Sequence, residues 1–263
     1  MQAQFQISTY FSHLAKSFHL HGIHSPFVFQ FEKKCLRDRN HFEEYLKLSR
    51  FRESLKKNNT ILTVEDHGAG SRVFKSDQRA INKILKHNSS SLKTAKTLFR
   101  VARYFNAKRI LELGTSLGIA TQAFALSNPK AEITTIEGSH QLADFTHNNL
   151  KQCSISNVNL TNCIFQDYLE GKASLKPEGK YDLIYIDGHH DGKATLSYFE
   201  QLLPFAHNET VFILDDIYWS RDMNEAWECL KRNDQVTASI DTYDLGFLFL
   251  RKEQRQQCFH IYL

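Results

Sequence analysis

Two patterns of apolar residues divide the chain near residue 90. In residues 1–90 apolar side chains such as Ile7 and Phe11 recur every three or four positions, which is the spacing of one face of an amphipathic helix. From Arg109 onward short apolar runs alternate with helical stretches, and this alternation is typical of βαβ units on a parallel sheet. The pattern predicts an N-terminal helical region at 1–90 and an α/β domain at 91–263.

The apolar runs also give the expected elements. Ser25 and Pro26 indicate a helix start, and further helices are expected over 76–87 and 91–104. The last two strands are joined by a short loop, and a parallel crossover needs about a dozen residues, so this pair is expected to be antiparallel. Strands are expected near 109–113, 133–137, 159–164, 181–187, 211–215, 236–241 and 246–251, and helices near 118–127, 140–152, 193–203 and 220–232.

The segment Glu-Leu-Gly-Thr-Ser-Leu-Gly, residues 112–118, follows the first of these strands and opens a helix. Gly114 and Gly118 allow a positive φ angle and a close approach of the backbone to a ligand. The segment lacks the middle glycine of a dinucleotide site and contains Glu112, which favours an adenosine-type cofactor that carries an amine over NAD. Glu137 ends the next strand, about twenty residues further on, where a carboxylate can accept both ribose hydroxyls.

Four segments in this order resemble the class I S-adenosyl-L-methionine-dependent methyltransferases, and among them the catechol and caffeoyl-CoA type O-methyltransferases. The likeness extends over about 92–252 and depends on residues 110–118, 135–137, 181–188 and 213–216. The resemblance implies a Rossmann-like, seven-stranded, mostly parallel α/β sheet with its last strand antiparallel and helices on both faces. It also implies S-adenosyl-L-methionine as cofactor.

The resemblance assigns roles to individual cofactor-binding residues. Glu112 is expected to hold the methionine ammonium, directly or through water, Glu137 the ribose, and Asp167 the adenine amino group. Asp167 could equally be a plain turn residue. The remaining expected cofactor-binding residues are Gly114, Thr115, Ser116, Gly118, Gly138 and Asp187.

Three further carboxylates indicate a divalent metal. Asp187, Asp215 and Asp216 follow predicted neighbouring strands, and hard oxygen ligands without thiolate or imidazole suit Mg²⁺ or Ca²⁺. In the family that the chain resembles the metal ligands are Asp, Asp and Asn, so Asp216 replaces the Asn. The alternative is that Asp215 and Asp216 cap the following helix and bind no metal.

The base expected to complete catalysis with Asp187 is His190. The catechol-type enzymes have a lysine three residues after the first metal-binding Asp, and this chain has His190 there, beside His189. Histidine titrates near neutral pH and can accept the proton of a hydroxyl. The alternative is an exposed histidine pair without a catalytic role.

Charge and composition limit the remaining possibilities. Residues 1–109 hold 21 Lys and Arg against 8 Asp and Glu, whereas residues 110–263 carry a net charge of −9. The basic part either packs on the acidic part or faces water, or it forms a binding surface for an acidic substrate or RNA. No RNA-binding motif supports RNA. The five cysteines form no Cys-x-x-Cys pair, so neither a zinc site nor a disulfide framework is indicated.

No apolar run approaches the roughly 20 residues that span a bilayer, and no signal peptide is recognisable, so a cytoplasmic protein is expected. We expect a methyltransferase acting on a small-molecule hydroxyl, with a homodimer as a further expectation. The alternatives are a metal-independent methyltransferase acting on RNA or another acceptor, an NAD-dependent oxidoreductase, and a cofactor-binding module without activity.

Two further segments allow two interpretations each. The loop 65–71 is either a connector or part of the cofactor pocket. The histidines of 19–24 could bind a metal, but local capping is favoured.

Overall fold

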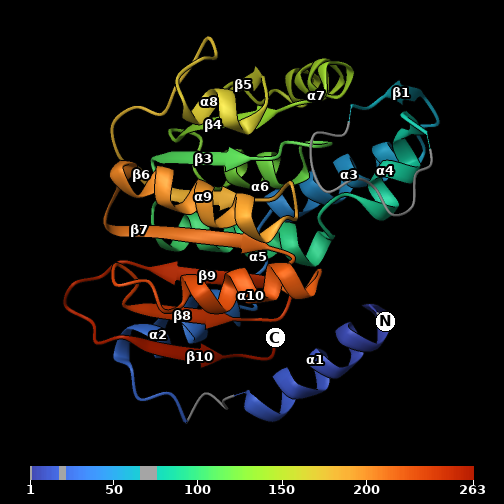
Figure 1. Cartoon of the computed structure of the whole chain (residues 1–263). Coiled ribbons are helices and arrows are strands. Elements are labelled where there is room, and N and C mark those ends of the chain that lie inside the picture. The colour runs from blue at the N-terminus through green and yellow to red at the C-terminus, as the bar shows by residue number, and fades with distance from the viewer. Residues whose placement is uncertain (1, 18–21, 66–75) are drawn as a thin grey trace. The chain divides into compact units, whose positions relative to one another are not determined.

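The computed structural model describes residues 2–17, 22–65 and 76–263, and its internal contacts separate two units (Figure 1). Unit 1 consists of Met1–Arg37 and Glu178–Leu263, and unit 2 of Asp38–Pro177. The first part of the predicted N-terminal region therefore groups with the C-terminal strands, and the rest lies in unit 2. The functional division predicted at residue 90 stays a prediction.

Unit 2 contains three parallel strands in the order β3-β4-β5. They are β3 (Arg109–Leu113), β4 (Glu132–Glu137) and β5 (Val158–Asn162), connected by helices α6 (Ile119–Ser127) and α7 (His140–Gln152). Four of the five residues of β3 are buried, as expected for a strand covered on both faces. The predicted strand and helix pattern is confirmed here, and the short helix α8 (Phe165–Leu169) is an addition.

The N-terminal part of unit 2 differs from the prediction at one place. It contains α3 (Glu44–Lys56), α4 (Ile81–His87) and α5 (Leu92–Tyr104). The helix predicted from Ser76 begins only at Ile81, because β2 (Gln78–Ala80) pairs antiparallel with β1 (Ile61–Thr63). Strand pairing with a distant segment thus overrides the helical spacing of these few residues.

Unit 1 contains five strands in the order β10-β8-β9-β7-β6. Strand β9 (Leu245–Phe249) runs antiparallel to both β7 (Ala206–Asp215) and β8 (Ala238–Asp241), which confirms the predicted reversal. Strand β6 (Tyr181–Ile186) runs parallel to β7. The sequence did not predict β10 (Gln257–His260), a short edge strand with one buried residue that pairs parallel with β8.

Helices cover both faces of the unit 1 strands. On β9 a Cβ atom at Gly246 would lie 2.8 Å from Trp227, so α10 (Arg221–Leu230) packs against this face. The next residue, Phe247, points to the opposite face and contacts Phe31 of α2 (Pro26–Phe31), with 5.7 Å between ring centroids. On β7, Phe212 contacts Phe199 of α9 (Gly192–Leu202).

The remaining helices of unit 1 are α1 (Gln2–Lys16), the π-helix η2 (Glu32–Leu36) and the 3₁₀-helix η3 (Leu203–Phe205). Together the two units confirm the predicted Rossmann-like class of alternating helices and mostly parallel strands, extended by β10. Among the helices of the described residues, none is both long and apolar enough to cross a membrane.

Candidate functional site

The turn after β3 has the backbone geometry that the glycines predicted. Gly114 has a φ angle of 105° and Gly118 one of 74°, and Ser116 between them has 47°. The amides of Gly114 and Thr115 both donate to the carbonyl of Ile136, at 3.0 and 3.2 Å, so the turn is fastened to β4. A Cβ atom at Gly118 would lie 2.7 Å from Cγ2 of Thr146, which shows why glycine is required.

Glu137 joins this turn to the end of β4. Its Oε2 atom accepts a hydrogen bond from the amide of Ser116 at 2.8 Å, and its Oε1 atom accepts one from the amide of Ser139 at 3.0 Å. Both bonds are charge-assisted, and each oxygen has a second lone pair. The carboxylate is therefore held in one orientation, and its contact with a ribose stays a prediction.

Glu112 has a more deeply buried position than the predicted ligand contact requires. Its side chain is fully buried, and its Oε2 atom accepts hydrogen bonds of 2.6 Å from both Thr121 and Thr135. The hydroxyls of Thr115 and Thr135 are 2.7 Å apart. Glu112 therefore stabilises the turn through hydrogen bonds with threonines of the neighbouring elements. Its contact with a methionine ammonium stays a prediction.

Asp167 lies in the first turn of α8 and is half-buried. Its carbonyl accepts hydrogen bonds from the amides of Lys172 and Ala173, and the contact of its side chain with the adenine stays a prediction. Burial and the charge of Asp167 raise the pKa of the Cys163 thiol to about 11. Gly138, also half-buried, is tied to β5 through its carbonyl, which accepts from Asn162 at 3.1 Å.

Unit 1 brings together two of the predicted metal ligands. Asp187 directly follows β6, Asp215 ends β7, and these strands pair with Ile186 opposite Leu214. The Tyr185 hydroxyl lies 3.0 Å from Oδ2 of Asp187 and 2.9 Å from Oδ2 of Asp215. The two carboxylates therefore share one hydroxyl group.

The surroundings of Asp187 and Asp215 disfavour a negative charge on both side chains at once. Burial raises the pKa of Asp187, and burial together with the charges of Asp187 and Asp216 raises the pKa of Asp215 well above its usual range. A divalent cation with oxygen ligands would relieve this repulsion. The two carboxylates are of the kind that Mg²⁺ prefers, and binding of a metal by Asp187, Asp215 and Asp216 stays a prediction.

The candidate base lies beside the third carboxylate. Nε2 of His190 is 3.9 Å from Oδ2 of Asp216, and the His190 ring lies 5.4 Å from the Trp219 ring. His189 is engaged elsewhere, because its Nδ1 atom lies 2.7 Å from the Tyr198 hydroxyl. His190 thus has a carboxylate neighbour, and its choice as the base over His189 stays a prediction.

The backbone of this region is strained. His189, His190 and Asp216 have φ angles of 67°, 41° and 54°, which non-glycine residues seldom adopt. Such conformations cluster at functional sites. The histidine loop is fastened by the Gly192 amide, which donates to Oδ2 of Asp222 at 2.5 Å.

Sequence reasoning missed Tyr185, because a tyrosine in an apolar strand carries no signal of a polar contact. Tyr218 is 9% exposed and donates to Asp241, so it is a core residue, whereas half-buried Trp219 contacts His190. Residues 66–71 of the glycine-containing loop, and His19 and His21, lie outside the described residues. His24 is exposed.

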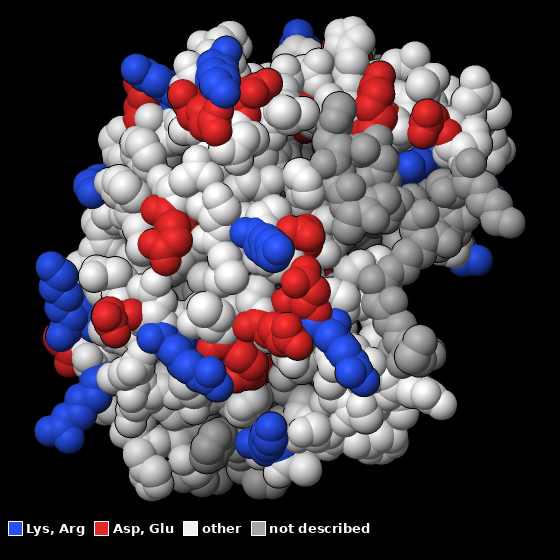
Figure 2. Space-filling view, in the orientation of Figure 1, with Lys and Arg blue, Asp and Glu red and all other residues white. Residues whose placement is uncertain are grey.

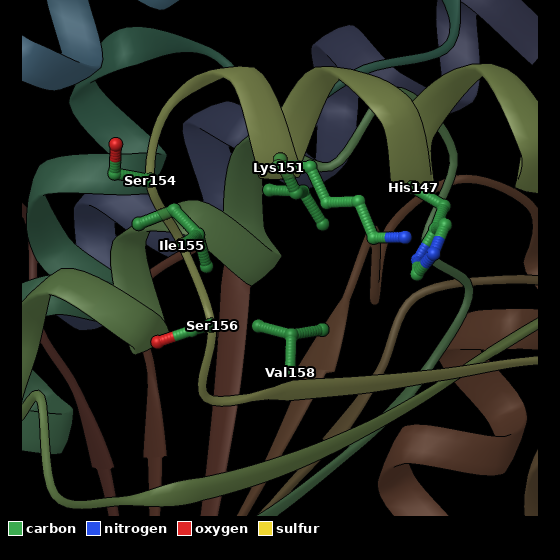
Figure 3. A pocket seen from close by; sticks show the side chains of 7 residues that line it. His147, Lys151, Ser154, Ile155, Ser156 and Val158 are labelled. Atoms are coloured by element: carbon green, nitrogen blue, oxygen red, sulfur yellow. The ribbon is translucent and has the colours of Figure 1, made fainter.

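Surface features add little to the candidate site. On the face shown in Figure 2 acidic and basic side chains are interspersed. A pocket of about 540 Å³ in unit 2 has a mixed lining (Figure 3), in which His147, Lys151, Ser154 and Ser156 are polar and Leu150, Ile155 and Val158 are apolar. None of the predicted site residues lines this pocket.

Comparison with known proteins gives one matching domain and one fold. Residues 111–217 match the family model described as a methyltransferase domain. An O-methyltransferase of Streptomyces achromogenes involved in tomaymycin synthesis, solved with S-adenosylmethionine, is similar in structure, with a TM-score of 0.58 and 18% identity over 81% of this chain and 91% of that one.

Two further solved structures have the same fold. A Podospora anserina methyltransferase bound to S-adenosylhomocysteine has a TM-score of 0.59 and 15% identity over 88% of this chain and 97% of that one. A Bacillus cereus O-methyltransferase in complex with S-adenosylhomocysteine has a TM-score of 0.54 and 18% identity over 84% and 96%. Residues 111–217 thus match a methyltransferase domain, and the chain has the fold of these S-adenosylmethionine- and S-adenosylhomocysteine-bound methyltransferases.

Proposed function

We propose that the protein transfers a methyl group from S-adenosyl-L-methionine to a hydroxyl group of a small molecule. The observation that carries the proposal is the group formed by Asp187, Asp215 and Tyr185, with His190 beside Asp216. Carboxylates and an imidazole are the groups that deprotonate a hydroxyl. The methyltransferase domain and the O-methyltransferases of the same fold support this choice of reaction.

In this proposal unit 2 binds the cofactor. Glu137, already oriented by two backbone amides, accepts hydrogen bonds from the ribose hydroxyls. Glu112 and its threonines keep the turn at Gly114 and Thr115 in shape. When bound, S-adenosylmethionine supplies a methyl group on a positively charged sulfur, which an oxygen nucleophile can attack.

Unit 1 activates the acceptor. The proton of the acceptor hydroxyl passes to the imidazole of His190, and Asp216 at 3.9 Å stabilises the imidazolium that results. Tyr185 keeps the side chains of Asp187 and Asp215 in place. A Mg²⁺ ion held by Asp187, Asp215 and Asp216 would lower the pKa of the acceptor hydroxyl and orient it.

The test uses the purified full chain, labelled S-adenosylmethionine and a panel of catechols, phenols and hydroxylated sugars. We expect product from at least one acceptor, with loss of activity in Asp187→Ala and retained binding of S-adenosylhomocysteine by calorimetry. Asp182→Asn is the matched control, because Asp182 lies on the same strand but pairs with His207 at 3.0 Å. Loss of cofactor binding in Asp187→Ala would instead show that Asp187 belongs to the cofactor site.

A metal-independent reaction is the second candidate, and the contact between His190 and Asp216 favours it, because a histidine base needs no metal. A chelator distinguishes the two, since it would abolish the metal-assisted reaction and leave the metal-independent one unchanged. Transfer to RNA but not to any small molecule would overturn the proposed acceptor class. Affinity for the cofactor without product from any acceptor would favour a binding module.

A further inference from the structure

A second cluster of potential metal ligands lies in unit 1, apart from the residues of the proposed reaction. Nε2 of His13, on α1, is 3.2 Å from Oδ1 of Asp241, the last residue of β8. Nδ1 of His260, the last residue of β10, is 3.4 Å from Oδ2 of the same carboxylate. One ligand atom from each residue lies within 4.8 Å of the other two. Three elements that are distant in sequence thus direct imidazole and carboxylate atoms at one point.

The cluster is buried, and its carboxylate is fixed by further hydrogen bonds. The side chains of His13, Asp241 and His260 are 0%, 1% and 16% exposed. Oδ2 of Asp241 accepts from the Tyr218 hydroxyl at 2.8 Å and from Nε1 of Trp227 at 3.1 Å. Hydrogen-bonded carboxylates of this kind are common around metal sites, because the outer donors orient the ligand.

The Oδ1 atom of Asp241 keeps room for one more partner. It accepts a single backbone bond, from the amide of Tyr243 at 2.9 Å, and its other lone pair is available toward His13. The backbone carbonyl of Asp241 also lies 3.1 Å from Nε2 of His13. Asp241 therefore presents two oxygen atoms to the imidazole of His13.

His260 supplies the observation that points to a cation. Its Nδ1 atom is buried and makes no hydrogen bond with any of the described residues, yet it lies 3.4 Å from a carboxylate oxygen that already accepts two bonds. A nitrogen lone pair and a carboxylate oxygen repel each other at this distance unless a positive charge lies near both.

We infer that His13, Asp241 and His260 form a binding site for a divalent transition metal of the Zn²⁺ type. Imidazole nitrogen and carboxylate oxygen bind Zn²⁺ at about 2.0–2.2 Å in a tetrahedral arrangement, which separates neighbouring ligand atoms by about 3.4 Å. Nε2 of His13 lies 3.2 Å from Oδ1 of Asp241 and Nδ1 of His260 lies 3.4 Å from Oδ2, so each imidazole is about one ligand-to-ligand distance from one of the two oxygens of the same carboxylate. The nitrogen ligands distinguish this site from the all-carboxylate set at Asp187, which suits Mg²⁺.

Metal at this site would fasten the N-terminal helix to the C-terminal strands. In Figure 1 α1 lies next to the end of the chain that follows β10. From α1, the Gln6 side chain donates to the carbonyl of Trp219 at 3.4 Å, and the Gln6 carbonyl accepts from the Tyr243 hydroxyl at 2.7 Å. Bound metal would therefore stabilise the helix that touches the segment carrying Trp219, which contacts the candidate base His190.

The test measures zinc binding to the full chain after removal of any affinity tag that contains histidine. Metal-free protein is dialysed against Zn²⁺, and the bound metal is counted by plasma mass spectrometry and titrated against a chromophoric chelator. We expect one equivalent of tightly bound zinc in the wild type, and an affinity at least about tenfold lower in His13→Gln and His260→Gln. Substitution with Co²⁺ should give visible d–d absorption that His260→Gln loses.

His207→Gln is the matched control, because His207 pairs with Asp182 and should leave the zinc affinity unchanged. The double variant Asp187→Asn and Asp215→Asn should also keep this zinc, so the outcome does not depend on the proposed reaction. His260 lies on an edge strand, so His260→Gln is the variant to use if His13→Gln fails to fold. Equal zinc binding in wild type and His260→Gln, or no zinc in the wild type, would overturn the inference and leave a proton as the positive charge.

Discussion

The phenol oxygen of Tyr185 lies 2.9 Å from Oδ2 of Asp215. The same oxygen is 3.0 Å from Oδ2 of Asp187. A tyrosine hydroxyl has one hydrogen, so the two carboxylates compete for a single donor. In the proposed reaction Tyr185 is a positioning residue, because its hydroxyl contacts the carboxylates at the ends of β6 and β7.

Tyr185→Phe is expected to lower methyl transfer, or the affinity for a divalent metal, by about 10- to 100-fold, as is usual when an outer partner of a functional carboxylate is lost. The change removes one hydroxyl and keeps the ring in the core. Affinity for S-adenosylhomocysteine, measured by calorimetry, should stay the same. A purely structural role would lower the free energy of unfolding and leave the rate per folded molecule unaltered.

Glu137→Gln should weaken binding of S-adenosylhomocysteine by at least about tenfold, because charge-assisted hydrogen bonds contribute about 1.5–3 kcal/mol each. The carboxylate accepts backbone bonds from Ser116 and Ser139, and a Gln side chain can accept through only one of its terminal atoms. Calorimetry measures the affinity. Glu132→Gln, at the exposed start of the same strand, is the control, and an equal loss there would contradict a specific role of Glu137.

Gly118→Ala should destabilise the protein by about 2 kcal/mol or more, because a left-handed φ angle disfavours alanine and crowding in a packed region adds to the cost. The added Cβ would lie 2.7 Å from Cγ2 of Thr146. Urea unfolding gives the free energy. In Gly118→Ala combined with Thr146→Ser the contact is removed but the φ angle of 74° remains, so only part of the loss should be recovered. Full recovery would mean that the backbone contributes nothing.

Cys163 should react slowly with iodoacetamide at neutral pH, because burial and Asp167 raise its thiol pKa to about 11 and the thiolate is the reactive form. Its rate should continue to rise as the pH approaches 11, which mass spectrometry of the labelled peptide can follow. Exposed Cys258 provides the internal standard. Asp167→Asn removes one of the two causes and should move the curve to lower pH, whereas an unchanged curve would leave burial as the whole explanation.

Strands and tight turns could be predicted from short segments of the sequence. The strands predicted from β3 to β9 are present, and β3 and β6 were the plainest, because a buried parallel strand needs consecutive apolar residues. Gly114 and Gly118 predicted positive φ angles, because a tight turn from a strand to a helix needs backbone conformations that glycine adopts most easily. The order of these segments was enough to indicate the methyltransferase fold that the comparisons confirm.

Contacts between segments that are far apart in the chain could not be predicted from the sequence. Edge strand β10 was missed because its polar residues resemble a loop until β8 supplies a partner. The residues from Gln78 to Ala80 were predicted as helix because nothing local shows that β1 pairs with them.

The sequence by itself determined which segments form strands and turns and which residue types are available for chemistry, because backbone sterics and the burial of apolar side chains act over a few neighbouring residues. Only the tertiary structure decided the partners. It placed the Tyr185 hydroxyl between two carboxylates, and it brought His13 to Asp241 across 228 positions of the chain. Hydrogen bonds and ion pairs depend on distances of a few ångströms, and for residues far apart in sequence those distances exist only once the elements have packed.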